Sequence, residues 1–258
     1  MGYLFALVSA GGSPGVTTAA IALALTWPTE AIVAECDPGG GDILAGLLGG
    51  HMPASRGLME HAIEAGRDSV AAAIGIGAQL LPLDTAQGRT VLPGLTDPRQ
   101  AAGLGPAWPA VTASLSAQGA DVIADCGRLD AGPGQPTAVI AAAQSVVLVL
   151  RPTLRQVWLA RSRVDMLRQL ADSRDCLVLM LTGPGTHTAR DVTQALQVPV
   201  AAMLPNDVRA AALLSDGIGS RRHLRTAPLM RSARTAGAQL RQHAAARIRQ
   251  LPQEPARR

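Results

Sequence analysis

The stretch Ser9-Ala10-Gly11-Gly12-Ser13-Pro14-Gly15-Val16-Thr17-Thr18 decides the fold of this chain. It follows a β-type run over 3–8 and opens an apolar helix over 19–25. A glycine-rich turn at such a strand-to-helix junction is typical of a phosphate-binding loop. Its glycines allow a tight turn that brings backbone N–H groups close to anionic oxygens, and the helix adds the positive end of its dipole.

The loop departs from the usual pattern at one position, because Val16 stands where such loops carry lysine. All 23 basic residues of the chain are arginines. No lysine elsewhere in the sequence can therefore supply the missing contact to the phosphate oxygens. Whether the chain is an enzyme depends on this substitution.

Composition limits the classes of protein to consider. The 258 residues, 48% of them apolar, suit one large domain or one domain with an appendage. Only five residues are aromatic, which argues against a stacking platform for single-stranded nucleic acid. The three cysteines are far apart and have neither zinc nor disulfide spacing, so we expect a reducing cytoplasm. We expect no secretion signal and no membrane-spanning helix.

Apolar runs of strand length alternate with helix-length segments, which predicts an α/β fold with a mostly parallel twisted sheet and helices on both faces. The predicted strands cover 3–9, 31–36, 79–83, 90–92, 122–125, 145–151, 176–182 and 200–204. The predicted helices cover 17–26, 43–48, 58–65, 98–118, 135–143, 154–171, 189–196 and 208–214.

The net charge of +4 is unevenly distributed. Residues 1–220 hold 13 arginines against 18 acids, whereas residues 221–258 hold 10 arginines against Glu254 alone. From Leu229 onward apolar residues recur at steps of three and four, which predicts a basic amphipathic helix ending at Pro252. We therefore divide the chain into a domain over 1–225 and a basic tail over 226–258. Packing on its own domain, a protein partner, an acidic membrane surface and DNA are all open as roles for this helix.

Carboxylates stand where two of the predicted strands end. Glu35 and Asp37 lie at the carboxyl end of the strand over 31–36, and Asp125 is the last residue of the strand over 122–125. The ligand crevice of an open α/β sheet lies outside such strand ends. An aspartate there either caps the next loop or holds Mg²⁺ and orients water. The joint occurrence of these residues behind a glycine loop favours a nucleotide site.

The order of these segments resembles the MinD/ParA family of deviant Walker A P-loop ATPases, over about residues 3–218. The loop of that family reads roughly G-K-G-G-x-G-K-T-T and is followed by a D-x-D-P segment and a Walker B strand. Here the corresponding segments are Glu35-Cys36-Asp37-Pro38 and Asp121-Val122-Ile123-Ala124-Asp125, and Leu204-Pro205-Asn206-Asp207 is similar to a late element near the base.

The resemblance implies a role for each matching position. Gly11 takes the place of the signature lysine that reaches across the dimer, and Val16 that of the P-loop lysine. It implies that Thr17 and Asp125 hold Mg²⁺ and that Asp37 and Asp125 are catalytic. The implied ligand is ATP or ADP, bound by Gly11, Gly12, Ser13, Gly15, Val16, Thr17, Thr18, Pro205 and Asp207.

The family reads the base with an asparagine after a late strand, where this chain has Thr182-Gly183-Pro184, so the choice of base is open. A charge-assisted contact to phosphate contributes about 1.5–3 kcal/mol, and more in a transition state. Losing both lysines therefore predicts weak or absent hydrolysis with binding retained, unless Arg128 or Arg151 compensates.

We expect a homodimeric switch or scaffold that positions partition, pilus or secretion machinery together with an unidentified protein partner. Through its basic helix it could lie at the inner face of the membrane or contact DNA. Two alternatives are an active ATPase switch that uses arginine in place of lysine, and a P-loop biosynthetic ligase.

Overall fold

The computed structural model describes residues 2–50, 56–130, 132, 134–170 and 176–250. The strands are β1 Leu4–Ser9, β2 Ala31–Glu35, β3 Leu81–Asp84, β4 Arg89–Leu92, β5 Asp121–Arg128, β6 Ser145–Leu150, β7 Leu177–Thr182 and β8 Val200–Leu204. The α-helices are α1 Val16–Thr26, α2 Leu58–Arg67, α3 Ser69–Gly75, α4 Ala101–Leu104, α5 Trp108–Ser116, α6 Thr137–Ala142, α7 Leu154–Leu170, α8 Ala189–Leu196, α9 Val208–Asp216, α10 Arg221–Leu224 and α11 Pro228–Gln250. The short 3-10 helices within the described residues are η1 Ile76–Gln79, η2 Thr85–Gln87, η3 Pro98–Gln100 and η4 Gly105–Ala107.

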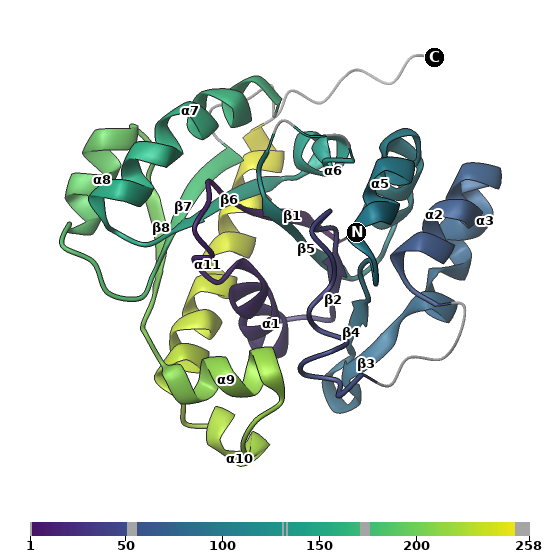
Figure 1. Ribbon diagram of the computed structural model, residues 1–258, viewed down its shortest axis with the longest axis horizontal. Helices are drawn as coiled ribbons and strands as arrows, with labels where there is room; N and C mark the ends of the chain where they lie inside the picture. The colour runs from purple at the N-terminus through teal and green to yellow at the C-terminus, as the bar shows by residue number, and fades with distance from the viewer. Residues whose placement is uncertain (1, 51–55, 131, 133, 171–175, 251–258) are drawn as a thin grey trace.

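One eight-stranded sheet runs through the molecule in the order β3-β4-β2-β5-β1-β6-β7-β8 (Figure 1). All neighbouring strands are parallel except β3 and β4. The predicted α/β class and all eight predicted strands are therefore confirmed. Because β1 lies at the centre between β5 and β6, the loop that follows β1 leaves the sheet beside the carboxyl ends of both neighbours.

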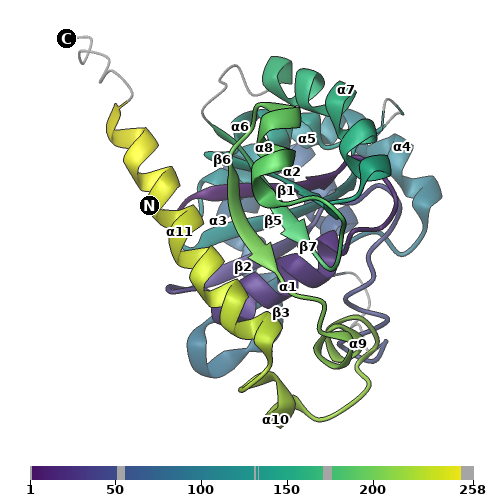
Figure 2. The same cartoon turned by 90° about the vertical axis from the view of Figure 1, so that its left-hand side faces the viewer.

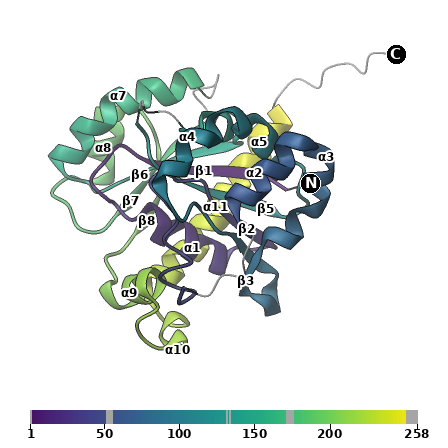
Figure 3. The same ribbon diagram turned by 45° about the vertical axis from the view of Figure 1, so that its right-hand side comes forward.

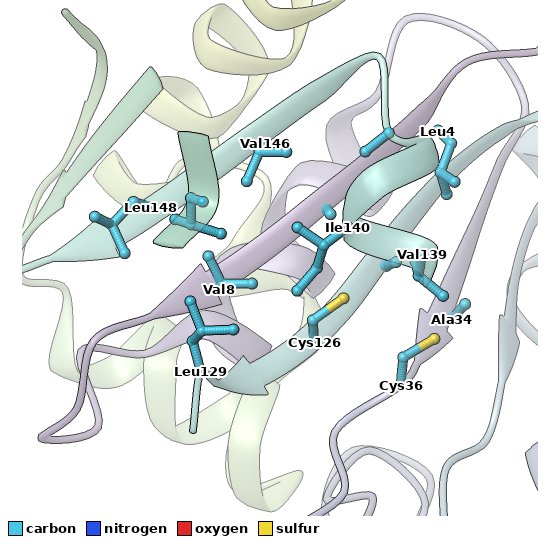
Figure 4. Close-up of a cluster of buried hydrophobic side chains, with 14 of the residues drawn as sticks. Leu4, Val8, Ala34, Cys36, Cys126, Leu129, Val139, Ile140, Val146 and Leu148 are labelled. Carbon is cyan, nitrogen blue, oxygen red and sulfur yellow. The ribbon is translucent and has the colours of Figure 1, made fainter. Parts of the chain in front are cut away.

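Helices cover both faces of the sheet (Figures 1 and 2). The helices α1, α9 and α11 pack on one face, and their buried side chains form one apolar layer with Phe5, Leu7 and other inward residues of the strands. The helices α2, α5, α6, α7 and α8 cover the opposite face and form the second layer (Figure 3). Figure 4 shows part of that layer, in which Val139 and Ile140 of α6 lie over Leu4 and Val8 of β1.

The predicted helix over 43–48 is wrong, because these residues form consecutive turns. Ile43 donates its backbone N–H to the buried Glu35 carboxylate at 2.9 Å, which fixes the chain direction there. A Cβ on Gly46 would lie 1.7 Å from the Ser215 carbonyl oxygen, so this segment packs backbone to backbone against α9. Periodicity alone could not reveal either constraint.

The prediction of one continuous helix over 98–118 is also wrong. The structure breaks it into η3, α4, η4 and α5, and the break lies at Gly103, Gly105 and Pro106. Proline cannot donate a helical hydrogen bond and glycine weakens a helix, so their close spacing explains the interruption. The helix α3 was not predicted, and Asp68 caps it by accepting from two backbone N–H groups at 3.0 Å.

The basic C-terminal helix is present as α11 and packs along α1 and β8 (Figure 2). Of its apolar side, Ala233, Ala236, Leu240 and Ala244 are fully buried in the core, whereas Ile248 near the end of the helix is 42% exposed. The small side chains allow close approach, since a Cβ on Gly237 would lie 2.9 Å from the Trp27 ring. Most of the apolar side is thus covered by its own domain, and the predicted end at Pro252 lies outside the described residues.

An ion pair joins α11 to the core. Arg241 donates from Nε to Asp121 Oδ2 at 2.7 Å, and Asp121 also accepts from the Trp27 indole at 2.8 Å and the Thr29 hydroxyl at 3.0 Å. Asp121 is the first residue of β5, at the amino end of the strand, whereas Asp125 lies further along it toward the carboxyl end. Its role is therefore structural. None of the described helices has both the length and the hydropathy needed to span a bilayer.

Candidate nucleotide-binding site

The glycine loop between β1 and α1 contains backbone conformations that residues with a side chain rarely adopt. The φ angles of Gly11, Gly12 and Gly15 are 145°, 73° and 91°, and Ser13 also has a positive φ of 46°. Gly15 precedes the first turn of α1 in a left-handed conformation. These angles turn the chain sharply from strand to helix and leave the N-terminus of α1 facing a cavity.

That cavity has a volume of about 460 Å³ and lies at the carboxyl ends of β1, β2 and β5. Its walls come from the glycine loop, the segment after β2, the end of β5 and the C-terminal end of α9. The lining residues are Ser9, Gly12, Ser13, Pro14, Gly15, Val16, Thr17, Thr18, Ile21, Asp37, Pro38, Gly39, Asp42, Ile43, Gly127, Arg128, Asp130, Gln135, Leu214 and Ser215.

Asp125 lies directly behind Thr17. It is fully buried, and its carboxylate accepts hydrogen bonds from the Thr17 side chain and from the Gly127 backbone N–H, the latter at 3.0 Å. Burial raises the pKa of Asp125 to about 7, although both hydrogen bonds act to lower it. Near neutral pH this carboxyl therefore exists in both protonation states, and a bound cation would favour its ionised form.

Asp37 reaches the cavity from the turn after β2. Its Oδ1 accepts from the Gly39 backbone N–H at 2.7 Å. Its carboxylate lies against Gly127, which has a φ of 60° and no side chain in the way. Burial raises the pKa of Asp37, whereas the charge of Arg128 lowers it. Asp37 and Asp125 are thus brought close to one another across Gly127.

Glu35 is a structural carboxylate. It accepts from the Ile43 backbone N–H at 2.9 Å and from the Gly94 backbone N–H at 2.9 Å, so it ties two loops together. Burial raises its pKa. Cys36 and Cys126 lie beside each other at the ends of β2 and β5, and burial raises the pKa of both thiols (Figure 4).

A second cavity of about 180 Å³ opens on the other side of the loop. Thr182 and Gly183 line it together with Pro205 and Asp207, and the Thr182 hydroxyl donates to the Pro14 carbonyl at 2.8 Å. Asp207 also caps α9, because its Oδ1 accepts from the Ala210 N–H at 3.1 Å. The loop residues Ser13, Pro14, Gly15 and Thr18 line both cavities.

The structure gathers most of the residues selected from the sequence. The first cavity is lined by Gly12, Ser13, Gly15, Val16, Thr17, Thr18 and Asp37. Gly11 does not line it and instead faces Leu159 and Arg128. Sequence reasoning missed Asp42, Asp130 and Gln135, because each lies in a loop beyond a strand end, where no spacing rule applies.

The two arginines that could replace the missing lysine, Arg128 and Arg151, lie in different cavities. Arg128 lines the first cavity, whereas Arg151 lines the second and lies beside Gly183. Val16, at the lysine position, is the first residue of α1, and its side chain is buried. It therefore supplies an apolar wall where a cation was expected.

The donors around the first cavity fit a magnesium ion that is completed by a ligand. The Thr17 hydroxyl and the Asp37 carboxylate line the cavity, and the buried Asp125 carboxylate lies behind Thr17. All three are hard oxygen donors of the kind Mg²⁺ prefers, and among the described residues no cation pairs with the Asp125 carboxylate. In the part of the chain that the structure describes, no group of three or more His, Cys, Asp or Glu residues could hold a metal ion unaided. Phosphate and water oxygens would have to supply the other ligands.

No protein-family model matches the sequence, and no curated protein matches it. Solved structures with the same fold include a ParA family ATPase from Chlorobium tepidum TLS, with a TM-score of 0.73 and 13% identity over 92% of this chain and 99% of that one. The septum site-determining protein MinD from Pyrococcus horikoshii OT3, complexed with Mg-ADP, has a TM-score of 0.68 and 15% identity over 98% and 100%. A variant of McdA from Cyanothece, in complex with ATP, has a TM-score of 0.66 and 16% identity over 98% and 100%.

The chain therefore has the MinD/ParA-type P-loop fold along nearly its whole length, as the sequence resemblance implied. In the structures named with Mg-ADP and with ATP the same fold holds a nucleotide.

Proposed function

We propose that this chain binds a magnesium nucleotide, ATP or ADP, in the first cavity and hydrolyses it weakly or not at all. The observation that carries the proposal is the contrast within one site. The loop conformation and the Thr17–Asp125 hydrogen bond are arranged as a magnesium nucleotide requires. The cation that would stabilise the transition-state charge is replaced by the buried Val16.

Each residue has a part in this proposal. The loop amides and the N-terminus of α1 bind phosphate oxygens, and Thr17 with Asp125 holds Mg²⁺, which supplies Lewis-acid neutralisation of phosphate charge when bound. Asp37 orients water at the cavity mouth. The second cavity, with Pro205 and Asp207, accommodates the base.

In this proposal the protein is a homodimer that responds to nucleotide and positions partition, pilus or secretion machinery through a protein partner. Three apolar side chains support an interface beside the loop, because Leu154, Trp158 and Leu159 of α7 are 69%, 68% and 41% exposed. Leu159 also contacts the position of Gly11, so this surface continues into the glycine loop. Exposed apolar patches of this kind mark interaction sites.

Isothermal titration of Mg·ATP and Mg·ADP into the wild type and Asp125→Ala tests the proposal. Asp165→Ala, which removes an exposed carboxylate of α7, is the matched control. We expect binding by the wild type and the control and at least roughly tenfold weaker binding by Asp125→Ala, as for a lost metal-ligand contact. Absence of binding of both nucleotides to the wild type would refute the proposal.

The second candidate is an active ATPase in which an arginine replaces lysine, and the place of Arg128 in the cavity wall favours it. Phosphate release above background that Asp125→Ala removes would select this candidate over the inactive scaffold.

A further inference from the structure

Arg128 is the one cation among the residues that line the first cavity within the described part of the chain. The other charged lining residues are Asp37, Asp42 and Asp130. A nucleotide triphosphate entering this cavity therefore meets more negative than positive charge. Without a positive side chain and a divalent cation, its phosphates would be repelled.

The side chain of Arg128 passes along the outer side of the glycine loop. Its Cδ lies 3.9 Å from the place where a Cβ on Gly11 would stand. Its charge also acts on Asp37, on the opposite wall. The Arg128 side chain thus passes beside Gly11, one of the two loop positions where the resemblance would place a lysine and this chain has no charge.

Arg128 forms an ion pair with Asp130 at the protein surface, and this pair can open. Its Nη2 lies 2.6 Å from Asp130 Oδ2, and the Arg128 side chain is 63% exposed. Arg163 of α7 lies 3.7 Å from the other oxygen of Asp130 and donates to the Leu129 carbonyl at 2.9 Å. Asp130 would therefore keep a cationic partner if Arg128 turned toward an anion.

We propose that Arg128 is the phosphate-binding cation of this site, and that it moves from Asp130 to the phosphates when a magnesium nucleotide binds. This inference rests on the proposed function, because it assigns a residue to the same cavity. Arginine suits the task, since its fork of N–H donors matches phosphate oxygens. It comes from the end of β5 and not from the loop, so loop motifs cannot identify it.

The test is isothermal titration of Mg·ATP and of magnesium tripolyphosphate into Arg128→Ala, Arg128→Lys and Asp130→Asn. Arg99→Ala is the matched control, because Arg99 is also exposed and pairs with an aspartate two residues away, Asp97, outside the cavity. We expect at least roughly tenfold weaker binding of both ligands to Arg128→Ala, which corresponds to one lost charge-assisted contact. Arg128→Lys should retain part of the affinity, Asp130→Asn should bind at least as tightly as the wild type, and Arg99→Ala should be unchanged.

The outcomes distinguish a failure of the Arg128 assignment from a failure of the proposed nucleotide binding. If the wild type binds Mg·ATP and Arg128→Ala binds within about twofold of it, well short of one lost contact, the inference is overturned and the proposed function stands. A loss of ATP affinity without a loss of tripolyphosphate affinity also overturns the phosphate contact. If the wild type binds neither ligand, the inference and the proposed function both fail. A melting temperature for each variant shows that it is folded, and Arg128→Lys provides the decisive comparison if Arg128→Ala is not.

Discussion

The carboxylate of Asp37 lies in the space that a side chain at Gly127 would fill. A Cβ built on Gly127 would stand 1.9 Å from Asp37 Oδ2, and the φ of Gly127 is 60°. The same glycine donates its N–H to Asp125 at 3.0 Å. One residue without a side chain thus allows the Asp37 carboxylate to line the cavity close to the buried Asp125 carboxylate.

Gly127→Ala should therefore displace Asp37 and strain the backbone. We expect a loss of about 1–3 kcal/mol in the free energy of unfolding and weaker stabilisation by Mg·ATP in thermal melts. Gly119→Ala is the control, because a Cβ there has no neighbour within 4 Å. Equal melting temperatures and equal nucleotide-induced shifts for the two variants would contradict this account of Asp37.

Asp125 makes stability depend on pH in a defined direction. Its pKa is raised from 3.8 to about 7 by burial, so the folded state favours the protonated acid. The stabilisation from this group is complete below the unfolded pKa and is lost as pH rises through the folded one. Asp125→Asn, which stays neutral, should therefore gain stability over the wild type as pH rises from about 4 to about 7. Denaturant unfolding at several pH values measures this difference, and a constant difference would refute the pKa assignment.

His61 also makes stability depend on pH, but its contribution falls as the pH falls, opposite to that of Asp125. It is completely buried in α2, and neither ring nitrogen has a hydrogen-bond partner among the residues that the structure describes. Burial lowers its pKa, although the charge of Glu64 raises it. The folded state therefore favours the neutral ring, and stability is lost as pH falls below the unfolded pKa of 6.5 toward the folded one. His61→Leu should flatten this loss as the pH falls below 6.5, and an unchanged slope in chemical unfolding would show that other groups cause it.

Removing Arg241, which pairs with Asp121, should lower stability more than removing another arginine of α11. Asp121 is 1% exposed and Arg241 35% exposed, so removing Arg241 leaves a buried carboxylate with only neutral donors. We expect Arg241→Ala to cost about 1–3 kcal/mol of unfolding free energy, reduced from the value for a fully buried pair by its exposure. Arg234→Ala, exposed on the same helix, should cost less than about 0.5 kcal/mol. Equal losses for the two variants would show that the pair contributes nothing specific.

The sequence predicted the eight strands and most of the first cavity because both depend on local patterns. Apolar runs identify strands wherever they lie in the chain, and a glycine loop identifies the start of its own helix. The segment over 43–48 and the broken helix over 98–118 could not be predicted as well, because long-range contacts and closely spaced helix breakers override periodicity there.

The same distinction applies to the site. Thr17 lies in the first turn of α1, Asp37 follows β2 and Asp125 lies in the carboxyl half of β5, so their positions could be inferred from the strand and helix pattern. The cavity placement of Arg128 depends on how the end of β5 passes the glycine loop, and the sequence could not separate it from Arg151. The packing of α11 likewise depends on Gly237 meeting Trp27, a contact between residues far apart in the chain.

The central claim is that the site binds a magnesium nucleotide and has lost the charge needed to cleave it. Phosphate release at saturating Mg·ATP, measured for the wild type, Asp125→Ala and Val16→Lys, tests this claim most directly. We predict that release by the wild type is at most slightly above that of Asp125→Ala and that Val16→Lys releases phosphate faster than the wild type. Rapid turnover by the wild type that Asp125→Ala abolishes and Val16→Lys does not increase would contradict the claim.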